Sequence, residues 1–231
     1  MSRINLITVC TEKYSMLYAR KLIQRFTELS DYIVDPYCIT DRPNQIDDLA
    51  TPLVAPFKTW WNKMYCYSNE MPAGWNVYLD IDNVLLKNFD EVIDFAINKN
   101  SKMACLADSI GWMNNKFCSS MMIYETGRMQ DIYELFLPNE KKLIKFDGGD
   151  QVWTGKFLRD NDICYLNETE LGDKWKKNLK FDLGTKVLGQ WKFPEFIPNN
   201  IKIVDCGGRP KPHELENLRY IKENWHDIGA Q

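Results

Sequence analysis

The chain has 231 residues, of which 45% are hydrophobic and 13% aromatic, so it is long enough to bury a sizeable core as one domain. Its 29 basic and 32 acidic residues are intermixed and give a formal charge of −3, which excludes a basic field for binding nucleic acid. No stretch approaches about 18 uncharged apolar residues, so we expect no transmembrane segment.

Strand-like and helix-like segments alternate along the chain. This alternation is typical of an α/β fold with a mostly parallel central sheet flanked by helices. Residues 4–10 predict a first strand, and apolar residues at helical spacing, Leu17, Leu22, Phe26 and Leu29 among them, predict a helix over residues 14–29. Residues 31–40 predict a second strand, in which Pro36 indicates a bulge or an edge position.

The alternation continues over the rest of the chain. The predicted elements are a helix over about residues 59–69, a strand over 76–82, a helix near 89–100, a strand over 102–108, an apolar run over 119–124, a helix over about 128–137, a short helix after residue 151, strands over 162–166 and 201–206, and a helix after His213. Residues 170–200 show no regular pattern. Because no repeat or flexible linker occurs, we predict one domain over residues 1–231.

Two aspartates follow the apolar lead-in of NVYLDIDNVLL, residues 76–86. In an extended segment Asp80 and Asp82 point the same way, while Ile81 turns toward the core. Two such carboxylates repel each other unless a cation or a proton lies between them. Mg²⁺ and Mn²⁺ accept one or two protein carboxylates and complete their shells with water and substrate phosphates. Since ligands bind at the carboxyl ends of strands in α/β sheets, the sequence predicts a divalent-metal diphosphate site. The alternative is that one aspartate caps a turn and the other is solvated.

The segment YLDIDNVLL resembles motifs of two families. It is similar to the DxD motif of GT-A glycosyltransferases, especially the family-8, glycogenin-like type. It also resembles the first motif of haloacid-dehalogenase-type phosphatases, D-x-D-x-T/V, which would make Asp80 a nucleophile and Asp82 a general acid/base. The other motifs of the chain decide between these two hypotheses.

The loop in IVDCGGRPKPHEL, residues 203–215, offers further ligand contacts. Gly207 and Gly208 let the backbone approach a ligand closely, and Arg209 and Lys211 are cations suited to a diphosphate. The alternative is that glycine and proline here only form an ordinary connecting loop before a helix.

The spacing of this loop resembles the C-terminal H-x-x-G-x-x-K-P motif of family 8. The resemblance aligns Gly208 with the glycine, Lys211 with the lysine, and Asp205 with the metal-binding histidine. It therefore implies three metal ligands, which are Asp80, Asp82 and Asp205. This chain departs from the family in having aspartate where the family has histidine, and His213 is an alternative third ligand.

Two earlier segments carry candidate donor-binding residues. After the first strand, Thr8, Thr11 and Tyr14 resemble a T-x-x-Y-like nucleotide pocket, with hydroxyls for a base or ribose and a ring for stacking. The alternative is that Thr11 caps the following helix and Tyr14 fills the core. In TWWNKMYCY, Lys63 resembles the family lysine that reaches the donor, although a lone lysine on a helix is usually solvated.

The segment FDGGDQVW places Asp150 and Gln151 just before a helix. They resemble the D-Q pair that lies near the reacting sugar in the family, which implies a catalytic role, although both residues are also ordinary helix caps. Asp108 at the end of a predicted strand is a candidate for a sugar hydroxyl. The match to the family's N-S-G-V segment is poor, because Cys118 and Ser120 replace the asparagine and the glycine.

Four ordered stretches fit the glycosyltransferase and one fits the phosphatase. The resemblance implies a single GT-A-like catalytic domain, with nucleotide binding over about residues 1–110 and the acceptor and C-terminal part over about 111–231. It implies transfer of a hexose, with retention, from a nucleoside-diphosphate sugar of the UDP-glucose or UDP-galactose class, with Mn²⁺ or Mg²⁺ as the cofactor. The acceptor, a carbohydrate, a lipid-linked molecule or a protein, is not identified. A sugar-nucleotide-binding module without catalysis is the other alternative.

Two features bear on the compartment. The first residues, MSRINLITVC, show neither a charged n-region nor a long apolar h-region, so we expect no signal peptide. The seven cysteines form no CxxC pair and predict reduced core thiols rather than disulfides or a zinc site. Together these features predict a cytoplasmic protein.

Overall fold

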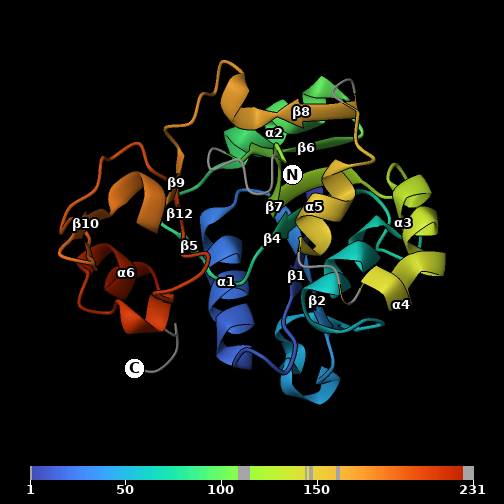
Figure 1. Cartoon of the computed structure of the whole chain (residues 1–231), viewed down its shortest axis with the longest axis horizontal. Helices are drawn as coiled ribbons and strands as arrows, with labels where there is room; N and C mark the ends of the chain where they lie inside the picture. The colour runs from blue at the N-terminus through green and yellow to red at the C-terminus, as the bar shows by residue number, and fades with distance from the viewer. Residues whose placement is uncertain (1, 109–114, 144, 146–147, 160–161, 226–231) are drawn as a thin grey trace.

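A computed structural model gives the structure of the chain and describes residues 2–108, 115–143, 145, 148–159 and 162–225. Its centre is a seven-stranded sheet of order β3-β2-β1-β4-β7-β6-β8 (Figure 1). Only the pairings of β7 with β4 and with β6 are antiparallel, so the predicted mostly parallel α/β sheet is confirmed. The strands are β1 (Arg3–Val9), β2 (Ile33–Thr40), β3 (Thr51–Val54), β4 (Trp75–Leu79), β6 (Met103–Ala107), β7 (Phe117–Glu125) and β8 (Ile163–Tyr165).

A second, three-stranded sheet has the order β5-β12-β9, with β5 (Asn83–Leu85), β12 (Ile203–Asp205) and β9 (Lys176–Asn178). Strand β12 runs antiparallel to β5 and parallel to β9. A hairpin of β10 (Thr185–Val187) and β11 (Gln190–Lys192) lies between β9 and β12 in the sequence. The chain therefore leaves the large sheet at the end of β4 and joins the small sheet at β5.

Helices cover both faces of the large sheet. The α-helices are α1 (Met16–Leu29), α2 (Asp90–Lys99), α3 (Gln130–Phe136), α4 (Glu140–Leu143), α5 (Gly149–Gly155) and α6 (Arg219–Asn224). The 3₁₀ helices are η1 (Pro43–Gln45), η2 (Asp47–Leu49), η3 (Thr59–Tyr67), η5 (Leu137–Asn139), η7 (Leu166–Glu168) and η9 (Pro212–Glu214), and η8 (Leu179–Leu183) is a π-helix. Helix α1 begins after Ser15, whose hydroxyl accepts a hydrogen bond from the backbone N–H of Leu17.

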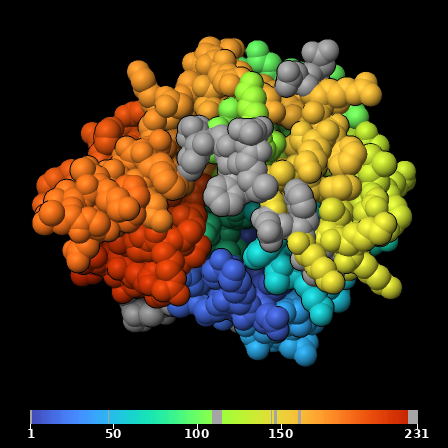
Figure 2. Space-filling model, viewed as in Figure 1, coloured from blue at the N-terminus to red at the C-terminus, as the bar shows by residue number. Residues whose placement is uncertain are grey.

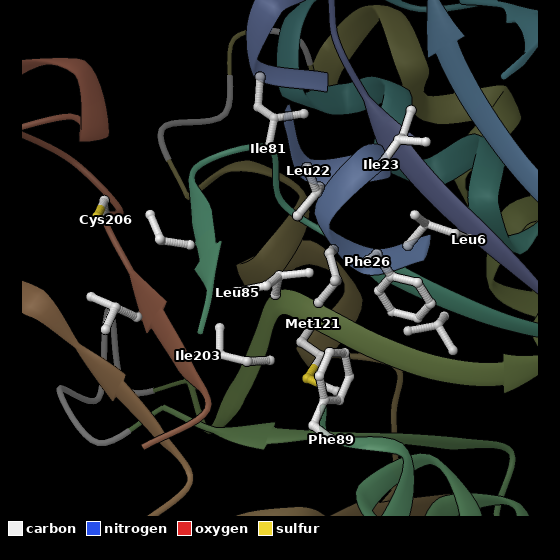
Figure 3. Packing of buried hydrophobic residues seen from close by; sticks show 14 of the residues in the cluster. Leu6, Leu22, Ile23, Phe26, Ile81, Leu85, Phe89, Met121, Ile203 and Cys206 are labelled. Carbon is white, nitrogen blue, oxygen red and sulfur yellow. The ribbon is translucent and has the colours of Figure 1, made fainter. Parts of the chain in front are cut away.

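The two faces of the sheet bury separate apolar cores. On one face, α1, α2, α6 and the small sheet pack together, and Figure 3 shows Leu85 and Ile203 of the small sheet lying near Phe26 of α1 and Met121 of β7. On the other face, η3 and α3 pack against the sheet, where Trp61 stacks on Phe136 with the ring planes 15° apart. Because strand side chains alternate, neighbouring residues of β1 belong to different cores.

The structure departs from the predicted elements in a few places. Strand β3 was not predicted, and the unpatterned residues 170–200 contain β9, η8 and the β10–β11 hairpin. The predicted helix over residues 59–69 is the 3₁₀ helix η3. Leu17, predicted on the apolar face of α1, is 39% exposed. Pro36 lies opposite Leu6 of β1, and the pairing of β2 with β3 begins only at the next residue, Tyr37. The side of β2 away from β1 is therefore unpaired at Pro36, as at an edge position, and no hydrogen bond is lost there for want of an N–H.

All seven cysteines are free thiols, and five of them are buried, as predicted for reduced core residues. Among the helices of the described residues, none combines the length and the apolar character needed to cross a membrane.

Candidate active site

The two aspartates of the DxD motif lie in the connection between the two sheets. Strand β4 ends at Leu79 and β5 begins at Asn83. The backbone N–H of Asp80 donates to the carbonyl of Ser120 (3.0 Å), and the amide of Asn83 donates to the carbonyl of Asp80 (2.9 Å), which fixes the turn. Ile81 is buried in the core, as predicted, and it also lines a cavity together with Asp80 and Asp82. The strand predicted over residues 76–82 ends earlier than expected, because residues 81 and 82 form a turn.

Strand pairing brings a third aspartate to this turn. In the antiparallel register of β12 and β5, Asp205 lies opposite Asn83. The next residue, Cys206, donates its backbone N–H to the carbonyl of Asp82 (3.1 Å). Asp205 and the DxD motif are thus neighbours although they lie far apart in the sequence.

Each of the three aspartates is paired with its own lysine. The Nζ–carboxylate pairs are Lys63–Asp80 (2.8 Å), Lys211–Asp82 (2.5 Å) and Lys176–Asp205 (2.8 Å). Among the described residues, no three acidic, histidine or cysteine side chains form a group that could hold a metal ion. In this structure the predicted metal ligands Asp80, Asp82 and Asp205 are each paired with a lysine, and their role as metal ligands stays a prediction. His213, the alternative third ligand, is hydrogen-bonded through Nδ1 to the hydroxyl of Tyr18, and it lines a cavity whose lining includes none of the three aspartates.

Burial and neighbouring charges act differently on these carboxylates. Burial, followed by the charges of Asp80 and Asp205, raises the pKa of Asp82. Burial would also raise the pKa of Asp205, but the charge and hydrogen bond of Lys176 outweigh it and lower the pKa overall. Asp205 is also held by the backbone N–H of Gly207, which donates to its Oδ1 (2.8 Å). Both oxygens of Asp205 are therefore engaged.

Glycine at positions 207 and 208 serves the close packing of this loop. A Cβ atom on Gly207 would lie 3.0 Å from Oδ1 of Asp205, which is tighter than ordinary contact. Gly208 has φ of +80°, a conformation that favours glycine. Gly207 thus brings the backbone close to Asp205, and the predicted close approach of this loop to a ligand stays a prediction.

Two adjacent cavities lie at this place, and Asp80 and Asp82 line the first of them. The first, here called the Thr11 cavity, has a volume of about 120 Å³, and its lining includes Thr11, Tyr14, Trp60, Lys63, Asp80 and Asp82. The second, the Gly208 cavity, has a volume of about 740 Å³, and its lining includes Tyr14, Tyr18, Gly208, Arg209, Lys211 and His213. Lys13 and Tyr14 line both cavities. Figure 2 shows the surface hollowed between the blue N-terminal and the red C-terminal segments, the two parts of the chain that line the Gly208 cavity.

Of the predicted N-terminal residues, Thr11 and Tyr14 line these cavities but Thr8 does not. Thr8 is fully buried inside β1, and its hydroxyl donates to the carbonyl of Leu79 (3.0 Å). Its side chain is used to join β1 to β4 rather than to bind a ligand. The alternative role of Thr11 as a helix cap is not observed, because Ser15 caps α1.

Lys63 joins the DxD motif to the predicted D-Q pair. Its ammonium group lies 3.2 Å from the hydroxyl of Ser119 and 3.9 Å from Oδ2 of Asp150, in addition to its pair with Asp80. Burial would lower the pKa of Lys63, but Asp150 and Asp80 raise it overall. Tyr78 completes this arrangement by donating its hydroxyl to Asp80 (2.6 Å). Lys63 is therefore a protonated cation shared by two carboxylates.

Asp150 and Gln151 occupy the first turn of α5. Asp150 is 5% exposed, and its Oδ2 atom has no hydrogen-bond partner among the described residues. Gln151 donates to the carboxylate of Asp108 (3.1 Å) and accepts from the backbone N–H of Ser119 (3.3 Å). Asp108 in turn lines a third cavity of about 110 Å³, together with Lys176 and Asp205. The predicted Asp108, Asp150 and Gln151 thus lie in one chain of contacts with Lys63.

We expect replacement of Asp150 by asparagine to change how stability depends on pH. Burial raises the pKa of Asp150, against the opposing charge of Lys63, so the folded state binds a proton more readily than the unfolded chain. The stability that the folded state gains from binding this proton is fully present below about pH 4, and it is lost as the pH rises through the raised pKa of the folded state. The Asp150→Asn variant lacks this loss. Its free energy of unfolding relative to wild type should therefore rise between pH 4 and pH 7 in urea titrations.

A matched control should show no such rise. Asp173 is an exposed carboxylate whose pKa is lowered by its hydrogen bond and charge interaction with Lys177. The stability that it contributes is present above about pH 4 and lost as the pH falls through the lowered pKa. The relative stability of Asp173→Asn should not rise over the same range. A flat or falling profile for Asp150→Asn would contradict the assignment.

Sequence reasoning missed two groups of this site. Lys176 lies in the stretch without a regular pattern, and nothing in its residue type distinguishes it from Lys177 beside it. It also donates to the hydroxyl of Ser120 (2.9 Å), one of the residues where the match to the family was poor. Tyr78 could have been found, because it lies two residues before Asp80 on the same side of the strand.

Comparison with known proteins identifies the fold. No protein-family model matches the chain, and no curated protein sequence matches it. Among solved structures, the galactosyltransferase LgtC in complex with donor and acceptor sugar analogues superposes with a TM-score of 0.65 at 10% identity, over 98% of this chain and 97% of that one. The apo form of the glycosyltransferase GlyE of Streptococcus pneumoniae TIGR4 gives 0.64 at 10% identity, over 97% of this chain and 61% of that one. The bifunctional glycosyltransferase WbbM gives 0.63 at 10% identity, over 99% of this chain and 50% of that one. The chain therefore has the GT-A glycosyltransferase fold.

Proposed function

We propose that the protein is a glycosyltransferase that moves a hexose, with retention, from a nucleoside-diphosphate sugar of the UDP-glucose or UDP-galactose class to a carbohydrate, lipid-linked or protein acceptor. One observation carries the proposal. Asp80, Asp82, Lys63 and Lys211, which come from three separate segments, meet where β4 ends, between two adjacent cavities of a GT-A fold. The carboxyl end of a strand at this place in an α/β sheet is where ligands bind.

The two cavities suit the two ends of a nucleoside diphosphate. Aromatic surfaces of Tyr14 and Trp60 in the Thr11 cavity offer stacking faces for a base. Lys211 and Arg209 border the Gly208 cavity and provide charge-assisted contacts for phosphate oxygens. The nucleotide would then lie across Tyr14, which lines both cavities.

The site suits a divalent cation that is held by two protein carboxylates, Asp80 and Asp82. Mg²⁺ and Mn²⁺ are commonly held by one or two carboxylates together with substrate phosphates, and this requires no third protein ligand. Asp80 and Asp82 would hold the ion, and Asp205 would remain with Lys176. When bound, such an ion stabilises negative charge on the departing diphosphate.

The protein's own groups would act around the sugar. Lys211 would neutralise charge on the nucleoside diphosphate as the bond to the sugar breaks, and Lys63 would hold Asp80 and Asp150 in place. Asp108, Asp150 and Gln151 would orient the sugar through its hydroxyl groups.

The alternatives receive less support. Asp80 would be the nucleophile of a phosphatase, but Lys63 contacts both of its oxygens and Tyr78 donates to one of them. The three solved structures compared above are glycosyltransferases. A binding module would bind the sugar nucleotide without turning it over, so only a turnover assay separates it from an enzyme.

The test is a thermal-shift panel of nucleoside diphosphates and sugar nucleotides, with and without Mn²⁺, followed by an assay of nucleoside diphosphate release. A ligand present at 100 times its dissociation constant stabilises the folded state by about 2.7 kcal/mol, which a shift of the unfolding temperature detects. We expect metal-dependent stabilisation by uridine compounds and slow release of UDP from one sugar nucleotide. Hydrolysis of generic phosphate esters with no response to any nucleotide would contradict the proposal.

A further inference from the structure

The β10–β11 hairpin lies apart from the two larger sheets. Among the described residues it forms a two-stranded sheet of its own, and Figure 1 shows β10 at the outer edge of the molecule. Val187 and Leu188 at its tip belong to neither of the two apolar cores. The tip of the hairpin therefore takes no part in the packing of either core.

Leu188 has a backbone conformation that suits leucine poorly. Val187 pairs with Gln190, so Leu188 and Gly189 form a two-residue turn, in which their φ angles are +49° and +81°. A type I′ turn requires positive φ at both positions, and asparagine followed by glycine is strongly preferred there. A leucine side chain in this left-handed region is strained.

No burial within the fold compensates this strain. Leu188 is 99% exposed, so it gains no apolar contact area from the part of the chain that the structure describes. A single exposed apolar side chain is ordinary on protein surfaces, but here full exposure and backbone strain fall on the same residue. Leucine at this position therefore destabilises the free protein, which indicates a partner that buries it.

An aromatic pair with two lysines lies behind the tip. Lys186 lies directly opposite Trp191 in the hairpin, and Nζ of Lys180 lies 5.6 Å from the centroid of the Trp191 ring. The ring of Phe181, which is 53% exposed, contacts Trp191 edge-on at 6.0 Å between centroids. The hairpin thus combines an apolar tip with a band of aromatic rings and ammonium groups.

The charge around the tip is positive, although the whole chain carries a formal charge of −3. Residues 179–194 contain three lysines, Lys180, Lys186 and Lys192, and one acidic residue, Asp182. The carboxylate of Asp182 accepts a hydrogen bond from the backbone N–H of Asn178 (2.6 Å), before the hairpin begins. The surface around Leu188 is therefore complementary to an anionic partner.

We propose that the β10–β11 hairpin docks on a membrane surface that contains anionic lipids. Leu188 enters the apolar layer, Trp191 lies at the boundary between the headgroups and the lipid tails, and the lysines contact the headgroups. Tryptophan is enriched at this boundary, and lysine stems can lie along apolar surface while the ammonium group stays in water. The proposal is independent of the proposed function, because it concerns binding to lipid alone.

A membrane explains this tip better than a protein partner does. A bilayer needs no pocket of matching shape, so it can bury one protruding leucine. The residues that dominate protein–protein interfaces are mainly tryptophan, tyrosine and arginine, and leucine is under-represented among them.

The expected association is weak and reversible. Burying the leucine side chain should strengthen binding by about 10–150-fold, and each lysine near an anionic surface should add about fivefold. Salt should weaken the second contribution and leave the first, because only the lysine contacts are screened.

Flotation with lipid vesicles tests the proposal without any enzyme substrate. The chain is mixed with vesicles of phosphatidylcholine alone, or of phosphatidylcholine with an equal amount of phosphatidylglycerol, and the bound fraction is measured against lipid concentration. We expect binding to the anionic vesicles, much weaker binding to the neutral vesicles, and release as the salt concentration rises. Absence of binding to the anionic vesicles would overturn the proposal.

The Leu188→Asn variant should change stability and vesicle binding in opposite directions. Asparagine before Gly189 suits the turn, so the urea midpoint of unfolding should rise. The amide cannot enter the apolar layer, so the affinity for anionic vesicles should fall by about tenfold or more. Vesicle binding equal to that of wild type would overturn the proposal. A lower urea midpoint would overturn it as well, because the fold itself would then explain the leucine.

A lysine variant and two controls locate the binding surface. Lys186→Gln should weaken binding to anionic vesicles by about fivefold and leave binding to neutral vesicles unchanged. The controls are Leu135→Asn, which removes an exposed leucine of α3, and Lys141→Gln, which removes an exposed lysine of α4. Neither control should change vesicle binding. An equal loss in the controls would show that binding is not a property of the hairpin and would overturn the proposal.

The same variants reveal other partners of the tip. A second copy of the chain would appear as self-association in sedimentation, which Leu188→Asn would abolish. An acidic protein with an apolar pocket would bind the wild-type chain but not this variant. Either result without binding to vesicles would overturn the proposal. Since the assay contains no nucleotide and no sugar, its outcome leaves the proposed glycosyltransferase function to be tested separately.

Discussion

Replacing Asp82 by asparagine is expected to lower the release of nucleoside diphosphate from a sugar-nucleotide donor by about 10²–10³-fold, the usual effect of removing one electrostatic contact that stabilises the transition state. Asp82 is 8% exposed at the end of the β4–β5 connection, where its carboxylate faces Lys211. The amide has nearly the same shape but carries no charge to hold a cation. Initial rates at saturating Mn²⁺ measure the loss.

The same variant should keep its stability. Burial and the charges of Asp80 and Asp205 raise the pKa of Asp82, so the amide relieves a repulsion, and Lys211 borders a cavity where its ammonium group can turn to water. We expect an unfolding midpoint close to that of wild type. Asp131→Asn, which removes an exposed carboxylate paired with Lys102, is the matched control and should retain full activity. A rate within tenfold of wild type for Asp82→Asn would contradict the assignment.

Replacing Lys176 by methionine should cost about 3–5 kcal/mol of unfolding free energy, because it leaves a buried carboxylate without its cation. The side chains of Lys176 and Asp205 are 4% and 11% exposed, so water compensates little. Denaturant titration at neutral pH measures the change. Lys177→Met, on the next residue of β9, breaks only a pair with the exposed Asp173 and should cost at most about 1 kcal/mol.

A double variant separates the charge from the packing. If the loss in Lys176→Met comes from an uncompensated carboxylate, adding Asp205→Asn should restore much of it, since the remaining amide carries no charge. Additive losses in the double variant would instead show that the lysine stem stabilises the core through packing alone.

Local patterns in the sequence predicted the mostly parallel large sheet, but they extended the strand with the DxD motif to Asp82, whereas β4 ends at Leu79 and a turn follows. The two-residue period predicted that Ile81 is buried, and this is observed, although Ile81 lies in a turn and lines the Thr11 cavity together with Asp80 and Asp82. The helical spacing over residues 14–29 likewise predicted α1 to within two residues at its start. Both features depend on residues that are close together in the chain.

The lysine partners could not be predicted in this way. Lys176 and Asp205 meet because β9 and β12 pair in parallel, and no periodicity in residues 170–200 indicates that pairing. The role of Thr8 was predicted wrongly for a related reason. A hydroxyl near the end of a strand suits a ligand, but Thr8 lies within the paired part of β1, where the neighbouring strand β4 provides its acceptor. Contacts between strands, rather than residue types, decide these cases.

The order in which the small sheet is completed has a consequence for biosynthesis. Strand β5 is made early, but its partner β12 and the loop bearing Lys211 leave the ribosome only after most of the large sheet has been made. Until then the edge of β5 has unpaired backbone groups, and the carboxylates of the β4–β5 turn lack the lysines of the later segments. The small sheet is therefore completed only when the C-terminal quarter of the chain docks.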